Sequence, residues 1–243
     1  MLKNIWTDLR DNPLDFDWQQ TIAYTFPHPK TADKQGLLAI GGDLNPFRVL
    51  QAYRQGIFPW FQPGNPILWW SPNPRLVLYP NNLKINRSFK QSLQKPWQIQ
   101  YDQRFKQVIV NCATTQGRDN NTWITQSMID CYTSLHHMGF AHSVEILLEN
   151  KLVGGLYGIS FGAAFFGESM FHLVPDASKV ALYVLCKIAN QLNLHFIDCQ
   201  LPNTHLENLG ATLVKRDAFL NQLAISNAET DRIGNWQNLG INI

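Results

Sequence analysis

The sequence predicts a mixed α/β (α+β) protein whose second half is a sheet covered by helices on one face. Three consecutive segments, 141–148, 152–159 and 163–171, have the apolar composition and short turns of antiparallel strands. Apolar residues then recur at helical spacing over 179–192, and we expect a further strand over 194–200. A strand meander followed by a helix and a strand indicates a layered α/β fold.

The elements before this meander follow from capping and turn residues. A helix is predicted from the Asn45-Pro46 start to a stop near Gly56, because apolar positions recur at helical spacing between them. The pattern further predicts a strand over 97–101 and helices over 105–112 and 127–138. After Ile225 no regular pattern continues, and we expect a poorly ordered tail.

Net charge and amino-acid composition divide the chain of 243 residues into two parts. Residues 1–95 are rich in Pro and Asn and carry eleven Lys and Arg against six Asp, a net charge of +5. Residues 96–243 carry nine against twelve acidic residues, a net charge of −3, and have longer regular elements. We therefore expect an N-terminal domain over 1–95 and a larger domain over 96–243.

The cationic part of the chain is also rich in aromatic residues. From Leu44 to Tyr101 there are seven Lys and Arg, no Asp or Glu, and aromatic residues throughout. Cations that meet phosphates, beside rings that stack on bases, are typical of proteins that bind single-stranded nucleic acid. The alternative is an ordinary aromatic core beneath a solvated cationic face.

Composition also bears on cellular location and on cofactors. The longest uncharged apolar stretch, Leu152 to Gly167, is interrupted by glycines and is shorter than the ~20 residues of a spanning helix. Residues 1–17 lack the apolar core of a signal peptide, so we expect a cytoplasmic protein without membrane contact. The four cysteines show no metal-ligand spacing, and we expect no metal and no cofactor.

Three groups of polar or ionisable residues are candidates for a functional site. Asp198 and Gln200 stand two apart on a predicted strand, which puts both on the face of Phe196. Glu168 is likewise predicted to share a face with Phe166 and Met170, where apolar neighbours would raise its pKa or demand a cationic partner. A third group of residues is expected to be capping or surface histidines, namely His136, His137 and His142.

Eight motifs, in order from about Phe26 to Leu223, resemble the bacterial leucyl/phenylalanyl-tRNA–protein transferases. They are Gly36-Leu-Leu-Ala-Ile-Gly-Gly-Asp-Leu44, Gly56-Ile-Phe-Pro-Trp-Phe61, Pro66-Ile-Leu-Trp-Trp-Ser-Pro72, Thr122-Trp-Ile124, His142-Ser-Val-Glu145, Gly154-Gly-Leu-Tyr-Gly158, Phe166-Gly-Glu-Ser-Met-Phe171 and Ile197-Asp-Cys-Gln200. The chain departs from the family pattern at Asp176, where Asn is expected, and at Leu147, where Trp is expected.

This resemblance implies a small N-terminal α+β domain packed on a domain similar to the acyl-CoA N-acetyltransferase fold. It also implies transfer of Leu, Phe or, less well, Met from aminoacyl-tRNA to the N-terminal α-amino group of a protein that begins with Arg or Lys. In the family this transfer marks the acceptor for N-degron proteolysis. We expect a monomer with these two partners.

The resemblance also assigns site residues. Gln200, polarised and oriented by Asp198, would hydrogen-bond the attacking amine, and Glu168 would meet the amine or the cationic side chain of the acceptor. Trp60 and Trp123 would stack on the terminal adenosine of the tRNA. The acceptor-stem phosphates would contact Arg87 and Lys90. The pocket for the transferred side chain would be formed by apolar residues, namely Leu156, Phe165, Met170, Leu182, Leu185 and Ile197.

Two rival functions and one mechanistic alternative stay open at the level of sequence. One rival is another acyltransferase that uses acyl-CoA or aminoacyl-tRNA, although Pro175-Asp-Ala-Ser-Lys179 does not supply the expected pyrophosphate loop. The other is a non-catalytic RNA-binding protein, which would not need the acidic and amide residues. If the protein is such a transferase, either Asp198 or the ribose hydroxyl of the tRNA could remove the proton from the attacking amine.

Overall fold

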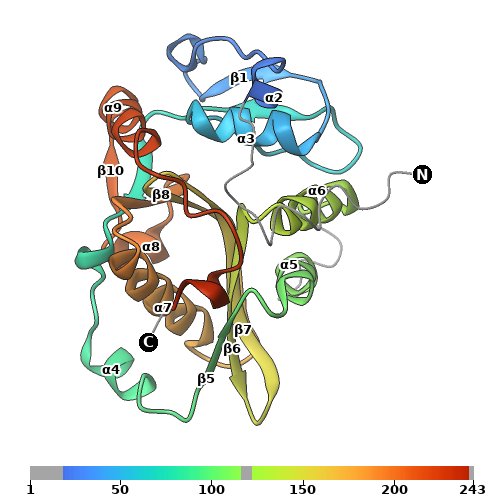
Figure 1. The fold of residues 1–243 in the computed structure, drawn as a ribbon. Coiled ribbons are helices and arrows are strands. Elements are labelled where there is room, and N and C mark those ends of the chain that lie inside the picture. Colours follow the sequence, from blue (N-terminus) through green and yellow to red (C-terminus); the bar gives the residue numbers. More distant parts are fainter. Residues whose placement is uncertain (1–18, 116–121, 241–243) are drawn as a thin grey trace.

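The computed structural model describes residues 19–115 and 122–240, and these form two sheets with surrounding helices (Figure 1). The expectation for residues 1–17 lies outside the described residues. Among the described residues, no helix is both long and apolar enough to cross a membrane. The mixed α/β class predicted from the sequence is confirmed.

The smaller sheet has three antiparallel strands in the order β1-β3-β2, formed by Leu37–Ile40, Leu68–Trp70 and Phe58–Pro59. Beside it lies α3 (Pro46–Arg54), with the short α2 (Gln19–Ile22) against it. Asn45 caps α3, because its side chain accepts a hydrogen bond of 2.9 Å from the backbone N–H of Phe47. The helix predicted from Asn45-Pro46 is therefore confirmed.

The larger sheet has seven strands in the order β10-β4-β9-β8-β7-β6-β5. Its strands are β4 (Arg75–Leu78), β5 (Gln98–Tyr101), β6 (Ala141–Leu148), β7 (Lys151–Phe161), β8 (Ala164–His172), β9 (Phe196–Gln200) and β10 (Thr212–Val214). Every neighbouring pair is antiparallel except β8 and β9, which run parallel. The predicted meander is confirmed. The boundary after residue 95 stays a prediction, and β4 from before it pairs within this sheet.

Helices cover both faces of the larger sheet, so the expectation of one covered face is wrong (Figure 1). α7 (Ala177–Gln191) packs on one face, where Leu156 and Phe165 point. α5 (Phe105–Thr114) and α6 (Gln126–His137) lie on the other, with Tyr157 and Phe166. Adjacent residues of β7 and β8 thus enter different cores, because side chains of a strand alternate between its faces.

Further elements complete the described chain. They are η2 (Pro29–Thr31), η3 (Pro80–Asn82), α4 (Arg87–Ser92), α8 (Thr204–Asn208), α9 (Arg216–Asn227) and η4 (Trp236–Leu239). α4 lies beside α7, where the rings of Phe89 and Tyr183 meet edge to face with centroids 6.4 Å apart. This contact places α4 next to α7, the helix that covers one face of the sheet, while Arg87 and Lys90 of α4 stay exposed.

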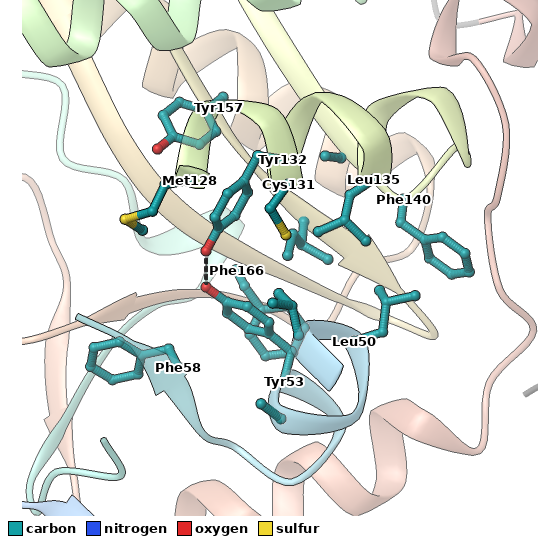
Figure 2. Packing of buried hydrophobic residues seen from close by; sticks show 14 of the residues in the cluster. Leu50, Tyr53, Phe58, Met128, Cys131, Tyr132, Leu135, Phe140, Tyr157 and Phe166 are labelled. Carbon is teal, nitrogen blue, oxygen red and sulfur yellow. Dashed lines mark hydrogen bonds between the residues drawn. The ribbon is translucent and has the colours of Figure 1, made fainter. Parts of the chain in front are cut away.

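One core joins the two parts of the chain (Figure 2). Leu50 and Tyr53 of α3 pack against α6, and the ring of Tyr53 meets that of Phe166 on β8 edge to face at 5.3 Å. The hydroxyl oxygens of Tyr53 and Tyr132 lie 2.7 Å apart in this core. The helix α3 is therefore held by the same apolar core that packs on the large sheet.

The expectation of a poorly ordered tail after Ile225 is wrong for residues 226–240, whereas residues 241–243 lie outside the described residues. α9 continues to Asn227, and Trp236 beyond it is fully buried. Its ring stacks on that of His142 at 4.1 Å, and its backbone N–H donates to Asp102 Oδ2 at 2.8 Å. The segment is mostly polar, so the sequence pattern does not indicate that Trp236 is buried and anchors it.

The expectation for the histidines is wrong for two of the three. His142 is buried, with Nδ1 2.8 Å from Asp102 Oδ2. His136 is also buried and stacks on Phe105 at 4.3 Å, whereas His137 is exposed. Asp102 supplies the buried polar partner that sequence patterning did not reveal.

We predict that Trp236→Ala destabilises the protein by about 3–5 kcal/mol, because it removes a fully buried aromatic side chain. The measurement is urea unfolding followed by circular dichroism. Ile225→Ala is the matched control at an exposed position close to the same segment, and we expect a change within ~0.5 kcal/mol. Equal stabilities of the two variants would show that the segment does not pack as described.

Candidate active site

A cavity of about 410 Å³ lies where β8, β9 and α7 meet. Its walls are largely apolar, and Glu168 and Gln200 also line it. All six residues predicted for a side-chain pocket lie in these walls, namely Leu156, Phe165, Met170, Leu182, Leu185 and Ile197. A small apolar chamber with a few polar groups is the usual form of a ligand site.

The cavity exists because two neighbouring strands part. β8 and β9 pair only from Ala164 with Phe196 to Phe166 with Asp198. Beyond that point the register of β8 shifts, because Tyr157 lies opposite Ser169 and Gly158 opposite Gly167, so Glu168 is an extra residue. A second shift in β9 pairs Leu76 with Gln200 and Val77 with Asp198.

These bulges correct the predicted alternation in β8. Phe166 and Met170 do not share a face, because Met170 lines the cavity with Phe165 while Phe166 packs in the opposite core. A strict two-residue period cannot anticipate an inserted residue. The prediction that Glu168 shares a face with Phe166 and Met170, between two large apolar side chains, is therefore wrong.

Glu168 is held by three hydrogen-bond donors. Its Oε1 accepts from Tyr53 Oη at 2.5 Å and from Gln200 Nε2 at 2.7 Å, and its Oε2 accepts from Tyr132 Oη at 2.8 Å. Burial raises the pKa of Glu168 to about 7, although the three hydrogen bonds oppose this shift. The same burial raises the pKa values of Tyr53 and Tyr132, so both phenols stay protonated donors.

Asp198 lies behind the cavity and does not line it. The guanidinium of Arg75 holds it through two hydrogen bonds, Nε to Oδ1 at 2.8 Å and Nη2 to Oδ2 at 2.6 Å. Both side chains are fully buried. Asp198 Oδ1 also accepts from the backbone N–H of Gln200 at 2.9 Å. That bond supports Gln200 in a left-handed conformation at φ 65°, which is uncommon for a residue with a side chain.

Arg75 is further enclosed by apolar and backbone groups. Its guanidinium carbon lies 4.7 Å from the ring centroids of both Phe58 and Phe219. Its Nη1 donates to the carbonyl of Gly56 at 3.2 Å. Sequence reasoning missed Arg75, Tyr53 and Tyr132, since nothing in their local pattern distinguishes a site residue from a surface cation or a core tyrosine.

The two predicted stacking residues lie at the same cavity. Trp60 and Trp123 both contribute to its wall and are partly exposed. Trp60 meets Trp70 edge to face at 5.9 Å, and Trp70 Nε1 donates to the carbonyl of Trp60 at 2.6 Å. The small sheet thus positions Trp60, whereas Trp123 lies just before α6.

The predicted basic pair lies outside the cavity. Arg87 and Lys90 are exposed on α4, the helix beside α7, whose Leu182 and Leu185 line the cavity. Among the described residues, no group of His, Cys, Asp and Glu is arranged to hold a metal ion. Cys199 lines the cavity, and burial raises the pKa of its thiol well above its ordinary value.

We predict that Arg75→Ala destabilises the protein by about 3–5 kcal/mol, because it leaves the buried carboxylate of Asp198 without its partner. Thermal or urea unfolding measures the change. Asp43→Asn breaks the exposed pair with Arg48, and we expect at most ~1 kcal/mol. Similar losses in the two variants would contradict the role given to the buried pair.

Comparison with known proteins identifies relatives over most of the chain. A protein of Legionella pneumophila (strain Corby) is 61% identical over 213 residues, covering 88% of this chain and 96% of the relative. Those of Thermodesulfovibrio yellowstonii and Myxococcus xanthus are 53% and 47% identical, covering 80% and 87% of this chain and 80% and 91% of theirs. All three are named leucyl/phenylalanyl-tRNA–protein transferase.

A solved structure and two family models are also similar to parts of this chain. A GCN5-related N-acetyltransferase-like protein from Streptococcus suis aligns over 66% of this chain and 60% of its own, with 12% identity and a TM-score of 0.33. A TM-score at this level does not assign a fold. The model of leucyl/phenylalanyl-tRNA protein transferase matches residues 77–224, and that of its N-terminal domain matches residues 42–73. The chain therefore belongs to the leucyl/phenylalanyl-tRNA–protein transferase family, a family of aminoacyltransferases.

Proposed function

We propose that the protein transfers Leu, Phe and, less well, Met from aminoacyl-tRNA to the N-terminal α-amino group of proteins that begin with Arg or Lys. The observation that carries this proposal is the apolar cavity with Glu168 and Gln200 in its wall. It offers space for one apolar side chain beside groups that can meet an amine. Transfer would mark the acceptor for N-degron proteolysis in the cytoplasm, with the enzyme acting as a monomer.

The reaction makes modest demands on the protein. An aminoacyl ester is already activated, and an α-amino group with a pKa near ~7.7–8.0 is partly neutral at cellular pH. The enzyme must therefore align two substrates and move one proton. Alignment alone can lower the barrier by roughly 7–11 kcal/mol.

Gln200 is the proposed aligning residue for the attacking amine. Its Nε2 donates to Glu168, which leaves its carbonyl oxygen as an acceptor for an N–H of the amine. An amide is not a base at neutral pH, so Gln200 acts by position. Asp198 accepts a hydrogen bond from the backbone N–H of Gln200 and not from its side-chain amide. Asp198 therefore supports the backbone of Gln200 and does not polarise its amide, contrary to the expectation from the sequence.

Glu168 is the proposed contact for the positive end of the acceptor. It is the only acidic residue in the cavity wall formed by the described residues. A cation placed beside it would favour its ionised form and lower its raised pKa. This supports a preference for acceptors whose N-terminal residue is cationic.

The apolar walls account for a donor range of a few amino acids. Leu182 and Leu185 of α7 line the cavity together with Leu156 and Met170 of the sheet. A hydrophobic pocket discriminates by only ~1–3 kcal/mol per methylene. Such a pocket admits Leu, Phe and Met together, and flexible Met170 can adapt to different shapes.

The tRNA would approach from the side of α4 and the small sheet. Trp60 and Trp123 would hold its terminal adenosine, where each stacked ring contributes about 1–3 kcal/mol. Arg87 and Lys90 on exposed α4 would contact backbone phosphates. The aminoacyl ester would then enter the cavity from the adenosine side.

The function is tested by incubating the protein with radiolabelled Leu-tRNA and short peptides. We expect label on peptides that begin with Arg or Lys, and none on an Arg peptide with an acetylated N-terminus. Gln200→Ala should lower the single-turnover rate by roughly 100-fold, since misplacement of a reacting group costs about that much. Gln107→Ala, at an exposed position on α5, should retain the wild-type rate. Label on the acetylated peptide, or a normal rate for Gln200→Ala, would refute this account.

We also predict a salt-dependent affinity for tRNA. Replacement of both Arg87 and Lys90 by Ala should reduce the slope of log affinity against log salt by about 1.5, because each phosphate contact contributes ~0.7–0.9. Filter binding at several salt concentrations measures the slope. Lys106→Ala, an exposed cation on α5 across the sheet, should leave it unchanged. Equal slopes in all proteins would exclude α4 from the tRNA interface.

A further inference from the structure

A ring of short contacts links Glu168 to two buried tyrosines. Tyr53 Oη lies 2.5 Å from Glu168 Oε1, and Tyr132 Oη lies 2.8 Å from Glu168 Oε2. The two phenol oxygens are themselves 2.7 Å apart, as the dashed line in Figure 2 marks. The three groups come from α3, α6 and β8, so only the folded chain brings them together.

The protonation state of Glu168 decides how many hydrogens this ring of three groups holds. An ionised carboxylate carries no hydrogen, so two phenol hydrogens must serve three oxygen–oxygen contacts. Both phenols then donate to the carboxylate, and the phenol–phenol contact lacks a hydrogen. A protonated carboxyl supplies a third hydrogen, and each contact can hold one. The ring can thus gain or lose a proton while its heavy atoms stay in place.

The carboxylate also keeps an acceptor position for that proton. Each carboxylate oxygen has about two such positions. Oε1 uses both, for Tyr53 and for Gln200 Nε2 at 2.7 Å. Oε2 has one contact, with Tyr132, among the described residues. Because Glu168 lines the cavity, a substrate bound there can deliver a hydrogen to it.

Other titratable groups face this ring from several elements. Cys131 of α6 and Tyr157 of β7 interact electrostatically with its members. Asp198 of β9 raises the pKa of Glu168, while its own charge is paired with that of Arg75 on β4. Burial is the largest cause and raises the pKa of Glu168 to about 7, within reach of an α-amino group.

We propose that Glu168, held by Tyr53 and Tyr132, takes the proton from the attacking α-amino group and returns it to the departing ribose oxygen. This inference rests on the proposed function and assigns its proton transfer. Asp198 is excluded from that task by position, because it is fully buried, bound to Arg75 and absent from the cavity wall. Tyr53 and Tyr132 are positioning residues.

The step is balanced without another reactant. The neutral acceptor nitrogen forms a bond to the ester carbonyl carbon, and one of its hydrogens passes to the carboxylate of Glu168. The bond between that carbon and the ribose oxygen then breaks. The ribose oxygen takes the hydrogen back from Glu168, which ends ionised as it began.

The test is the pH dependence of single-turnover Leu transfer with bound Leu-tRNA and a saturating Arg peptide. The wild-type rate requires a neutral amine and an ionised Glu168. Log rate should therefore rise with a slope near 2 where the pH lies below the pKa values of both groups, and level off in two steps as the pH passes them. Glu168→Gln should retain only the amine step, with a slope near 1 and a rate lower by roughly 100-fold or more. Two steps, or a wild-type rate, in Glu168→Gln would overturn the proposal.

The tyrosines are tested by Tyr53→Phe and Tyr132→Phe. Each removes a donor to the ionised carboxylate, so the Glu168 step should move upward by about half a pH unit or more. Tyr79→Phe is the matched control, because its hydroxyl donates to Gln222 and not to this ring, and its steps should stay in place. An equal loss of rate at every pH in the ring variants would overturn the positioning role.

A direct titration covers the case in which a ring variant does not fold. Carbon-13 NMR of protein labelled at the Glu carboxyl carbons reports Glu168, assigned by its loss in Glu168→Gln. We expect a midpoint near neutral pH, and an ordinary value near ~4.3 would overturn the proposal. Absence of transfer at every pH would refute the function, whereas transfer without the Glu168 step would refute this inference alone.

Discussion

The buried ion pair between Arg75 and Asp198 joins the two parts of this chain at the point where the site is built. Arg75 stands on β4 and Asp198 on the neighbouring β9, and both are fully buried. Removing two charges from water is costly, and only good geometry offsets the cost. Here a two-point contact, the carbonyl of Gly56 and the rings of Phe58 and Phe219 enclose the guanidinium. Asp198 then steadies the left-handed backbone of Gln200.

The cavity depends on departures from regular sheet geometry. β8 and β9 separate after three paired residues, and each carries an inserted residue near that point. The insertion in β8 turns Glu168 toward Tyr53 and Tyr132, while Phe165 and Met170 face the cavity. Bulges are common next to active sites because they re-aim side chains without breaking a sheet. In this protein they place a carboxylate and an apolar pocket side by side.

The charge of the chain agrees with the two proposed substrates, which carry opposite charges. A formal net charge of +2 is the sum of a cationic N-terminal part and an acidic remainder. Exposed Arg87 and Lys90 lie on α4, the proposed contact for an anionic tRNA, and Glu168 lies in the cavity, the proposed contact for a cationic peptide end. A near-neutral total therefore does not argue against an RNA partner.

The sequence alone predicted the strand meander, the helix from the Asn45-Pro46 start to near Gly56, the helix over 179–192 and the motifs that mark the family, because periodicity, capping and short motifs are local properties. Only the tertiary structure decided which faces are covered, that Trp236 anchors the C-terminal segment, and that Arg75 is buried. It also decided that Tyr53 and Tyr132 meet Glu168, since these residues are 115 and 36 positions away in the chain. Contacts at such separations depend on how elements pack, and strand bulges erase the two-residue period from which side-chain direction is predicted.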